Sequence, residues 1–213
     1  MQKVLKKLDG KDYLQVLSNT VIPTSYLGPI EYYAILLKYN CRIEIHENFI
    51  KQSLRNRCEI DGPNGKIRLT VPKENNGKQI VEKIKICYKE NWQKNHWKSI
   101  TSTYNSSPFF QFYKDDLKKI YEIKDSLLIN FNNRTQQIIL NILRHNTHIR
   151  NTTMYIDKGK FLDLRNYSFN SHKPKKYSQV FIQKNNFIPH LSILDLICNV
   201  GPDCTHYLQK LNI

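Results

Sequence analysis

Apolar patterning in the early part of the chain predicts a strand, a helix and a second strand in succession. Val16 to Thr20 has the composition of a short strand, and Cys41 to His46 alternates like a half-buried one. Between them, Pro29 suits the first turn of a helix that continues to Leu37. Strands joined in this way pair in parallel, so the loops that follow them lie at one edge of the sheet. Open α/β sheets bind their ligands at that edge.

Further along, the pattern alternates first and then becomes helical. The expected elements are a hairpin of 57–60 with 66–71, a strand at 81–87, helices at 91–104, 109–123 and 126–143, a returning strand at 149–156, a polar irregular segment at 158–176 and a helix at 187–200. Ser192 and Asp195 form a capping-box-like pair in this last helix, and Gly201 ends it. The sequence therefore predicts a single domain over 1–213 with an α/β fold. Its mixed sheet would come from the strand-helix-strand unit and the hairpin, covered by helices from the middle and C-terminal parts.

Composition fits a globular protein, with 40% hydrophobic and 24% charged residues among 213. No window approaches the ~20 apolar residues that a membrane span needs, and no apolar run follows the first lysines, so we expect neither a span nor a secretory signal. The five cysteines are odd in number and include no C-x-x-C pair. This pattern favours reduced thiols and a cytoplasmic location.

The net charge of +15 raises the question of a nucleic-acid partner. Lysines are scattered along the whole chain, and Asn, Ile and Tyr are also abundant; all four types are written with A/T-rich codons, so base bias explains much of the charge. We interpret the basic clusters at 3–11 and 173–176 as solvated faces. The pattern argues against nucleic acid. A non-catalytic module that binds RNA or a protein through its basic surface stays the alternative function.

The densest group of chemically capable side chains stands at the end of the strand at Cys41 to His46. His46 is the candidate general base, with Glu47 and Glu44 as steering carboxylates. In strand geometry, Glu44 and His46 face the same way, roughly 7 Å apart. The alternative is a surface strand that leads into a basic loop.

We expect the substrate-binding side chains to be Tyr26, Lys51, Asn56, Arg57, Trp92 and His96. Lys51 and Arg57 can hold a carboxylate or a phosphate. Trp92 and His96 stand one helical turn apart and suit a ring-lined pocket wall. Two structural alternatives remain open. In the first, Asn56 and Arg57 tie their loop to the sheet by hydrogen bonds. In the second, His96 is a core histidine whose hydrogen bonds are made within the protein.

The motifs of several common site types are missing. The pair H-E occurs once without a second histidine at helical spacing, and neither a Walker loop nor G-x-G-x-x-G occurs. We therefore predict no metal and no cofactor. Ser192 lies outside any G-x-S-x-G elbow, so we interpret it as a helix cap and not as a nucleophile.

Several longer motifs appear in order along almost the whole chain: P-T-S-Y-L-G-P-I-E-Y-Y (23–33), I-H-E-N-F-I-K-Q-S-L-R-N-R (45–57), L-T-V-P (69–72), N-W-Q-K-N-H-W (91–97), Y-N-S-S-P-F-F (104–110) and F-I-P-H-L-S-I-L-D-L-I-C-N-V-G-P (187–202). Together they resemble the WbqC-like family of bacterial proteins. Typical members open with a H-Q-P-x-Y-x-P-W-like string. The corresponding stretch here, 19–29, lacks its His and Gln, so no role of those two residues is carried over.

The resemblance implies a function through the genes that accompany the family, which include those for surface polysaccharides such as O-antigen. It implies a cytoplasmic transferase that adds an acyl or aminoacyl group, such as glycine, to an amino sugar or a similar small anionic or sugar-linked substrate. The oligomeric state is left open.

Overall fold

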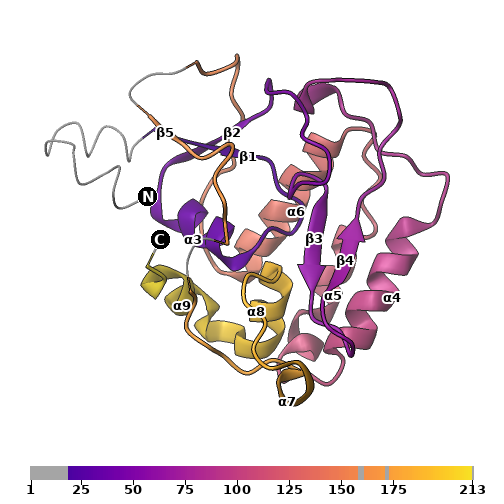
Figure 1. The fold of residues 1–213 in the computed structure, drawn as a ribbon, viewed down its shortest axis with the longest axis vertical. Helices are drawn as coiled ribbons and strands as arrows, with labels where there is room; N and C mark the ends of the chain where they lie inside the picture. The colour runs from indigo at the N-terminus through magenta and orange to yellow at the C-terminus, as the bar shows by residue number, and fades with distance from the viewer. Residues whose placement is uncertain (1–18, 158–160, 171–172, 213) are drawn as a thin grey trace, which may run out of the picture.

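The computed structural model describes residues 19–157, 161–170 and 173–212, and it has the mixed α/β architecture that the sequence predicts (Figure 1). In these residues, β1 (Thr20–Pro23) lies between β2 (Cys41–Glu44) and β5 (Leu162–Asp163) in a parallel sheet. Helix α3 (Ile30–Lys38) connects β1 to β2, and Thr20 is paired with Cys41. The predicted parallel strand-helix-strand unit is confirmed.

The predicted hairpin is also confirmed. β3 (Arg57–Ile60) and β4 (Ile67–Thr70) pair antiparallel and form a separate two-stranded sheet. Gly65 in their turn has φ of +100°, a conformation that residues with a Cβ rarely adopt. The hairpin turn therefore depends on a glycine at this position.

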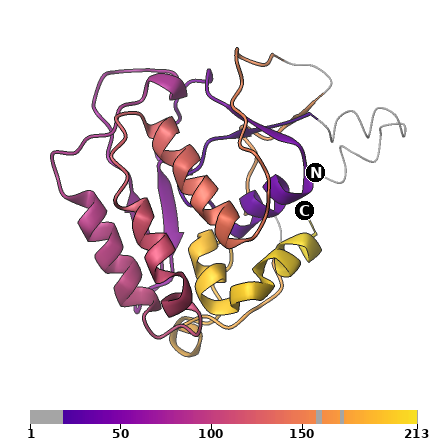
Figure 2. The same cartoon turned by 180° about the vertical axis from the view of Figure 1, so that it is seen from behind.

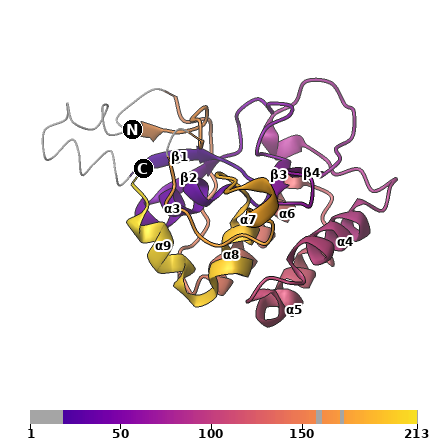
Figure 3. The same cartoon turned by 60° about the horizontal axis from the view of Figure 1, so that its bottom comes forward.

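Helices cover the strands mainly from one side. The remaining helical elements are η1 (Val81–Lys83), α4 (Trp92–Tyr104), α5 (Phe110–Ile120), α6 (Leu128–Ile142), α7 (Ile182–Asn185), α8 (Ile193–Val200), η2 (Gly201–Asp203) and α9 (Cys204–Lys210). α5 packs against α6 and α8, and α3 packs against α8 and α9. Figure 2 shows α6 from behind, and Figure 3 shows the strands above α4, α5, α8 and α9. No helix in the described ranges is long and apolar enough to span a membrane.

Two expected strands do not form. The segment 81–87 begins as the short helix η1, because its backbone groups bond to several different segments instead of one partner strand: Glu82 N–H donates to Ile45 O, and Ile86 N–H to Ser126 O. The segment 149–156 contributes one parallel bridge, in which Asn151 is paired with Ile43.

Three element boundaries differ from the sequence-based prediction. β1 extends into the expected loop as far as Pro23, while residues 16–18 of the predicted strand lie outside the described residues. β5 lies in the segment that we expected to be irregular. The last long helix begins at Ile193, capped by Ser192 through Leu194 N–H; the carboxylate of Asp195 bonds to Tyr177 and not to the cap.

Candidate functional site

The loops that follow the three parallel strands surround two adjoining hollows of about 290 and 520 Å³. The hollows share the lining residues Pro29, Gln52, Ser53, Leu54, Glu59 and His190, and together we call them the sheet-edge groove. The smaller hollow also contains Arg57, Cys58 and Arg68, while the larger extends along 165–170. The groove thus lies at the carboxyl edge of the parallel sheet, where α/β proteins commonly bind ligands.

Backbone hydrogen bonds hold the groove loops together. Tyr26 N–H donates to Leu54 O at 2.9 Å, which joins the loop after β1 to the loop after β2. From the C-terminal part, Ser192 N–H donates to Glu59 O at 2.7 Å. The prediction that the first two loops meet at one edge is therefore confirmed, and a third segment, preceding α8, completes the groove.

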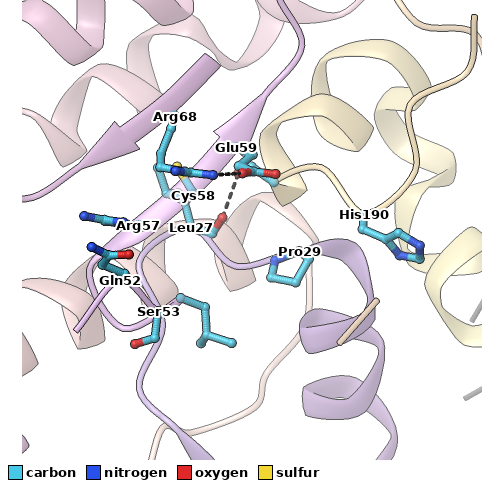
Figure 4. Close-up of a pocket in the computed structure, with 11 residues that line it drawn as sticks. Leu27, Pro29, Gln52, Ser53, Arg57, Cys58, Glu59, Arg68 and His190 are labelled. Carbon is cyan, nitrogen blue, oxygen red and sulfur yellow. Dashed lines mark hydrogen bonds and ion pairs between the residues drawn. The ribbon is translucent and has the colours of Figure 1, made fainter. Parts of the chain in front are cut away.

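The charged side chains of the smaller hollow differ in their pairing. Glu59 contacts Lys66 at 3.0 Å and Arg68 at 2.9 Å, as Figure 4 shows for Arg68. Burial alone would raise the pKa of Glu59, but the hydrogen bonds from Arg68 and Lys66 lower it below its ordinary value. Arg57 lines the same hollow, and within the described residues its Nε is buried without a hydrogen-bond partner. Arg57 can therefore receive an anion.

A histidine and a carboxylate from distant parts of the chain meet at the groove. Nδ1 of His190 lies 2.5 Å from Oε1 of Glu31, in the first turn of α3. The Glu31 side chain has no exposed surface, whereas that of His190 is 17% exposed. Burial raises the pKa of the Glu31 carboxyl, against the lowering effect of His190. In Figure 4, His190 lies beyond Pro29, on the far side of the pocket from Gln52 and Arg57.

His46, the expected general base, lies next to η1 and is not among the residues that line the groove. Its side chain is 21% exposed, and its Nδ1 lies 3.6 Å from Oε2 of Glu82. Its Nε2 is buried and has no partner in the described part of the chain. The carboxylate that contacts the imidazole is therefore Glu82, and the catalytic role of His46 stays a prediction.

Glu44 and Glu47 make structural contacts that the sequence did not indicate. The Glu44 carboxylate accepts the backbone N–H of His46 at 2.9 Å and the Thr152 hydroxyl at 2.8 Å, so it bonds to the backbone and not to the imidazole of its neighbour. Oε1 of Glu47 pairs with the Arg55 guanidinium at 2.6 Å, and both side chains are buried. These contacts fix the loop after β2.

Lys51 and Asn56 lie at opposite extremes of burial. Lys51 is exposed and does not line the groove. Asn56 is buried, and its amide donates to Val71 O at 2.9 Å, while Val71 N–H donates back to Asn56 O. Asn56 therefore ties the loop to the segment after β4, as one alternative from the sequence expected of Asn56 and Arg57 together; the Nε of Arg57 makes no such bond within the described residues.

The expected ring-lined wall is a buried cluster. The Tyr26 hydroxyl contacts His96 Nδ1 at 3.0 Å and the Tyr121 hydroxyl at 2.9 Å. The rings of Trp92 and His96 are 5.1 Å apart. Burial lowers the pKa of His96 to about 4, so the ring is neutral near pH 7. Tyr26, Trp92 and His96 are brought together as predicted, but in the core, and their role in substrate binding stays a prediction.

The sequence did not reveal the pair of His190 and Glu31, because 159 positions separate the two residues. The sequence did show where His190 lies, directly before the segment that caps α8, but not its pairing with Glu31. In the described part of the chain, no three His, Cys, Asp or Glu side chains are grouped as metal ligands would be.

Comparison with known proteins agrees with the resemblance seen in the motifs. A model of the WbqC-like protein family matches residues 25–165 and 153–207, which together contain every residue that lines the groove. The chain is 25% identical to the uncharacterized protein Rv1507c of Mycobacterium tuberculosis, in an alignment that covers 76% of this chain and 84% of that protein. No solved structure matches the chain.

Proposed function

Because the chain belongs to the WbqC-like protein family, we propose that it is a cytoplasmic transferase of cell-envelope biosynthesis. It moves an acyl or aminoacyl group, such as glycine, onto an amino sugar or a similar small anionic substrate. The sheet-edge groove supports this proposal because it is open to solvent, of small-molecule size, and placed where α/β proteins commonly hold their ligands.

The observation that carries the proposal is the unpartnered guanidinium in the groove. In the described residues, no ion pair joins the Arg57 guanidinium to an acidic side chain and its buried Nε has no hydrogen-bond partner, while the cations beside it are paired with Glu59. The Arg57 side chain is partly exposed and lines the smaller hollow, so a carboxylate or phosphate there can neutralise a charge that no described acidic side chain pairs. The planar guanidinium also fits such groups with two parallel hydrogen bonds. Arg57 thus selects for an anionic substrate.

Transfer to an amine or a hydroxyl also requires a base. His46 is the candidate from the sequence, with Glu44 and Glu47 as the residues that hold its loop. Replacing His46 with Ala tests this assignment: a folded variant with full transferase activity would exclude His46 as the base. The transferase proposal itself does not depend on which residue acts as the base.

The ligand of the groove can be identified directly. Native protein is purified at low salt and denatured, and the released small molecules are identified by mass spectrometry. The amount of anionic ligand that co-purifies with Arg57→Gln should be lower than with the wild type by a factor of about ten or more, because the variant lacks a charged hydrogen-bond donor. Arg134→Gln is the matched control, since Arg134 is exposed on α6 and pairs with Asp125 away from the groove.

Two results would contradict the proposal. One is equal ligand retention by the two arginine variants. The other is a bound nucleic acid whose affinity falls steeply between low and moderate salt, which is the behaviour of a protein that binds phosphates through a basic surface.

A further inference from the structure

His190 combines access to the groove with a fixed ring orientation. It lines both hollows, while its Nδ1 is held by the fully buried carboxyl of Glu31. Its Nε2 has no hydrogen-bond partner in the described part of the chain and is not among the buried atoms. One nitrogen is therefore engaged by the protein, and the other has no protein partner among the described residues.

A carboxylate that accepts the Nδ1 proton selects one neutral tautomer, in which Nε2 carries a lone pair. The geometry points to His190 as the general base of the groove, with Glu31 as its positioning residue. This inference rests on the proposed transferase function and specifies its chemistry. The acceptor is a primary amine or a hydroxyl on a small molecule whose anionic group binds Arg57, at the other side of the smaller hollow.

The reaction then needs one proton relay. The acceptor nitrogen or oxygen forms a bond to the carbonyl carbon of an acyl ester or thioester donor, and its proton passes to Nε2. The bond between the carbonyl carbon and the leaving oxygen or sulfur breaks with its electron pair. The imidazolium, stabilised by Glu31, returns the proton to that leaving group. No redox partner is required.

Other groups in the smaller hollow favour direct transfer over a covalent enzyme intermediate. The Ser192 hydroxyl donates to Leu27 O at 2.8 Å, and the Ser53 hydroxyl donates to Ile50 O at 2.7 Å. Burial raises the pKa of the Cys58 thiol, which keeps it protonated. Each of these groups is thus poorly suited to act as a nucleophile, so the base acts on the acceptor itself.

The backbone at His190 suggests a suitable variant. Its φ is +62°, in the left-handed region, where asparagine is more easily accommodated than most residues with a Cβ. In His190→Asn, the side-chain amide can still donate to Glu31 from the place of Nδ1, but nothing replaces Nε2. The variant therefore removes the base while it keeps the buried hydrogen bond.

The first test measures where the proton resides. Full-length protein labelled with ¹⁵N at histidine is examined by NMR near neutral pH. We expect the His190 signal to show a protonated Nδ1 and an unprotonated Nε2. Glu31→Leu, which removes the acceptor at similar volume, should shift the proton toward Nε2. A proton on Nε2 in the wild-type protein would overturn the inference.

The second test measures chemistry with a defined probe, the release of nitrophenolate from 4-nitrophenyl acetate with glycine, which has both an amine and a carboxylate, as acceptor. His190→Asn should lower the rate above buffer by about 100-fold, a typical contribution of a general base. His206→Asn is the control and should leave the rate unchanged, because His206 is exposed on α9. Equal rates for the wild type and His190→Asn would overturn the inference, and so would the absence of any rate above that of buffer for both proteins. The Arg57→Gln ligand experiment reports separately on the proposed function.

Discussion

Protonation of the buried His96 should destabilise the protein in mild acid. Burial lowers the pKa of His96 to about 4 from an ordinary value of 6.5. A lowered histidine pKa contributes stability that is present above pH 6.5 and is lost as the pH falls through 4. Each tenfold difference in proton affinity corresponds to ~1.4 kcal/mol, so the full loss is about 3 kcal/mol. At about pH 5 the loss is already ~2 kcal/mol.

The assay is urea unfolding at about pH 7.5 and pH 5, for the wild type and for His96→Gln. Glutamine stays neutral and can still bond to the Tyr26 hydroxyl. The wild type should therefore lose ~2 kcal/mol more than the variant between the two pH values. Other titrating groups are common to both proteins and cancel in this comparison. His206→Gln, at an exposed position, should behave like the wild type. Equal pH dependence of the wild type and His96→Gln would refute the argument.

Three further changes should have measurable effects on the free energy of unfolding in urea. Burial raises the pKa of Asp195 from 3.8 to about 6, so the stability that its protonated form contributes is present below pH 3.8 and is lost as the pH rises through 6. Between acid and neutral pH, the free energy of unfolding of Asp195→Asn should therefore rise by up to ~3 kcal/mol relative to that of the wild type. A difference between the two proteins that does not change with pH would contradict this. Gly201→Ala should lower the free energy of unfolding by at least ~2 kcal/mol. Gly201 has φ of +64°, and a Cβ there would also lie 2.5 Å from the ring of Phe109. Gly77→Ala, with φ of +73° but open space, should cost less, and an equal cost would argue against the clash. Glu47→Gln should cost about 3 kcal/mol because it leaves the buried charge of Arg55 unpaired, and an unchanged urea midpoint would rule this out.

The parts of the fold that the sequence predicted are those with strong local signals. Pro29 marks the start of α3, and the turn at Gly65 marks the hairpin, so both were located within a few residues. The strand expected at 81–87 was wrong for a physical reason. Ile84 and Ile86 do face inward, as the alternation predicts, but the segment bonds to separate loops and has no single neighbouring strand.

The candidate site was predicted less completely, because it depends on contacts between distant segments. Helical spacing placed Trp92 beside His96, and the chemistry of its side chain made Arg57 a candidate, yet burial decides which of these residues a ligand can reach. The pairing of Glu31 with His190 depends on how the segment before α8 packs against the start of α3. Such packing has no signature in a single sequence.

The groove draws its lining from stretches as far apart as Leu27 and Ser192. During synthesis on the ribosome, it therefore cannot be completed until Ser192 has been added, and a chain truncated before His190 would lack one side of it. A small molecule seated there would link early and late parts of the chain. Its occupancy should raise resistance to heat and to proteases in proportion to the logarithm of its concentration above the Kd.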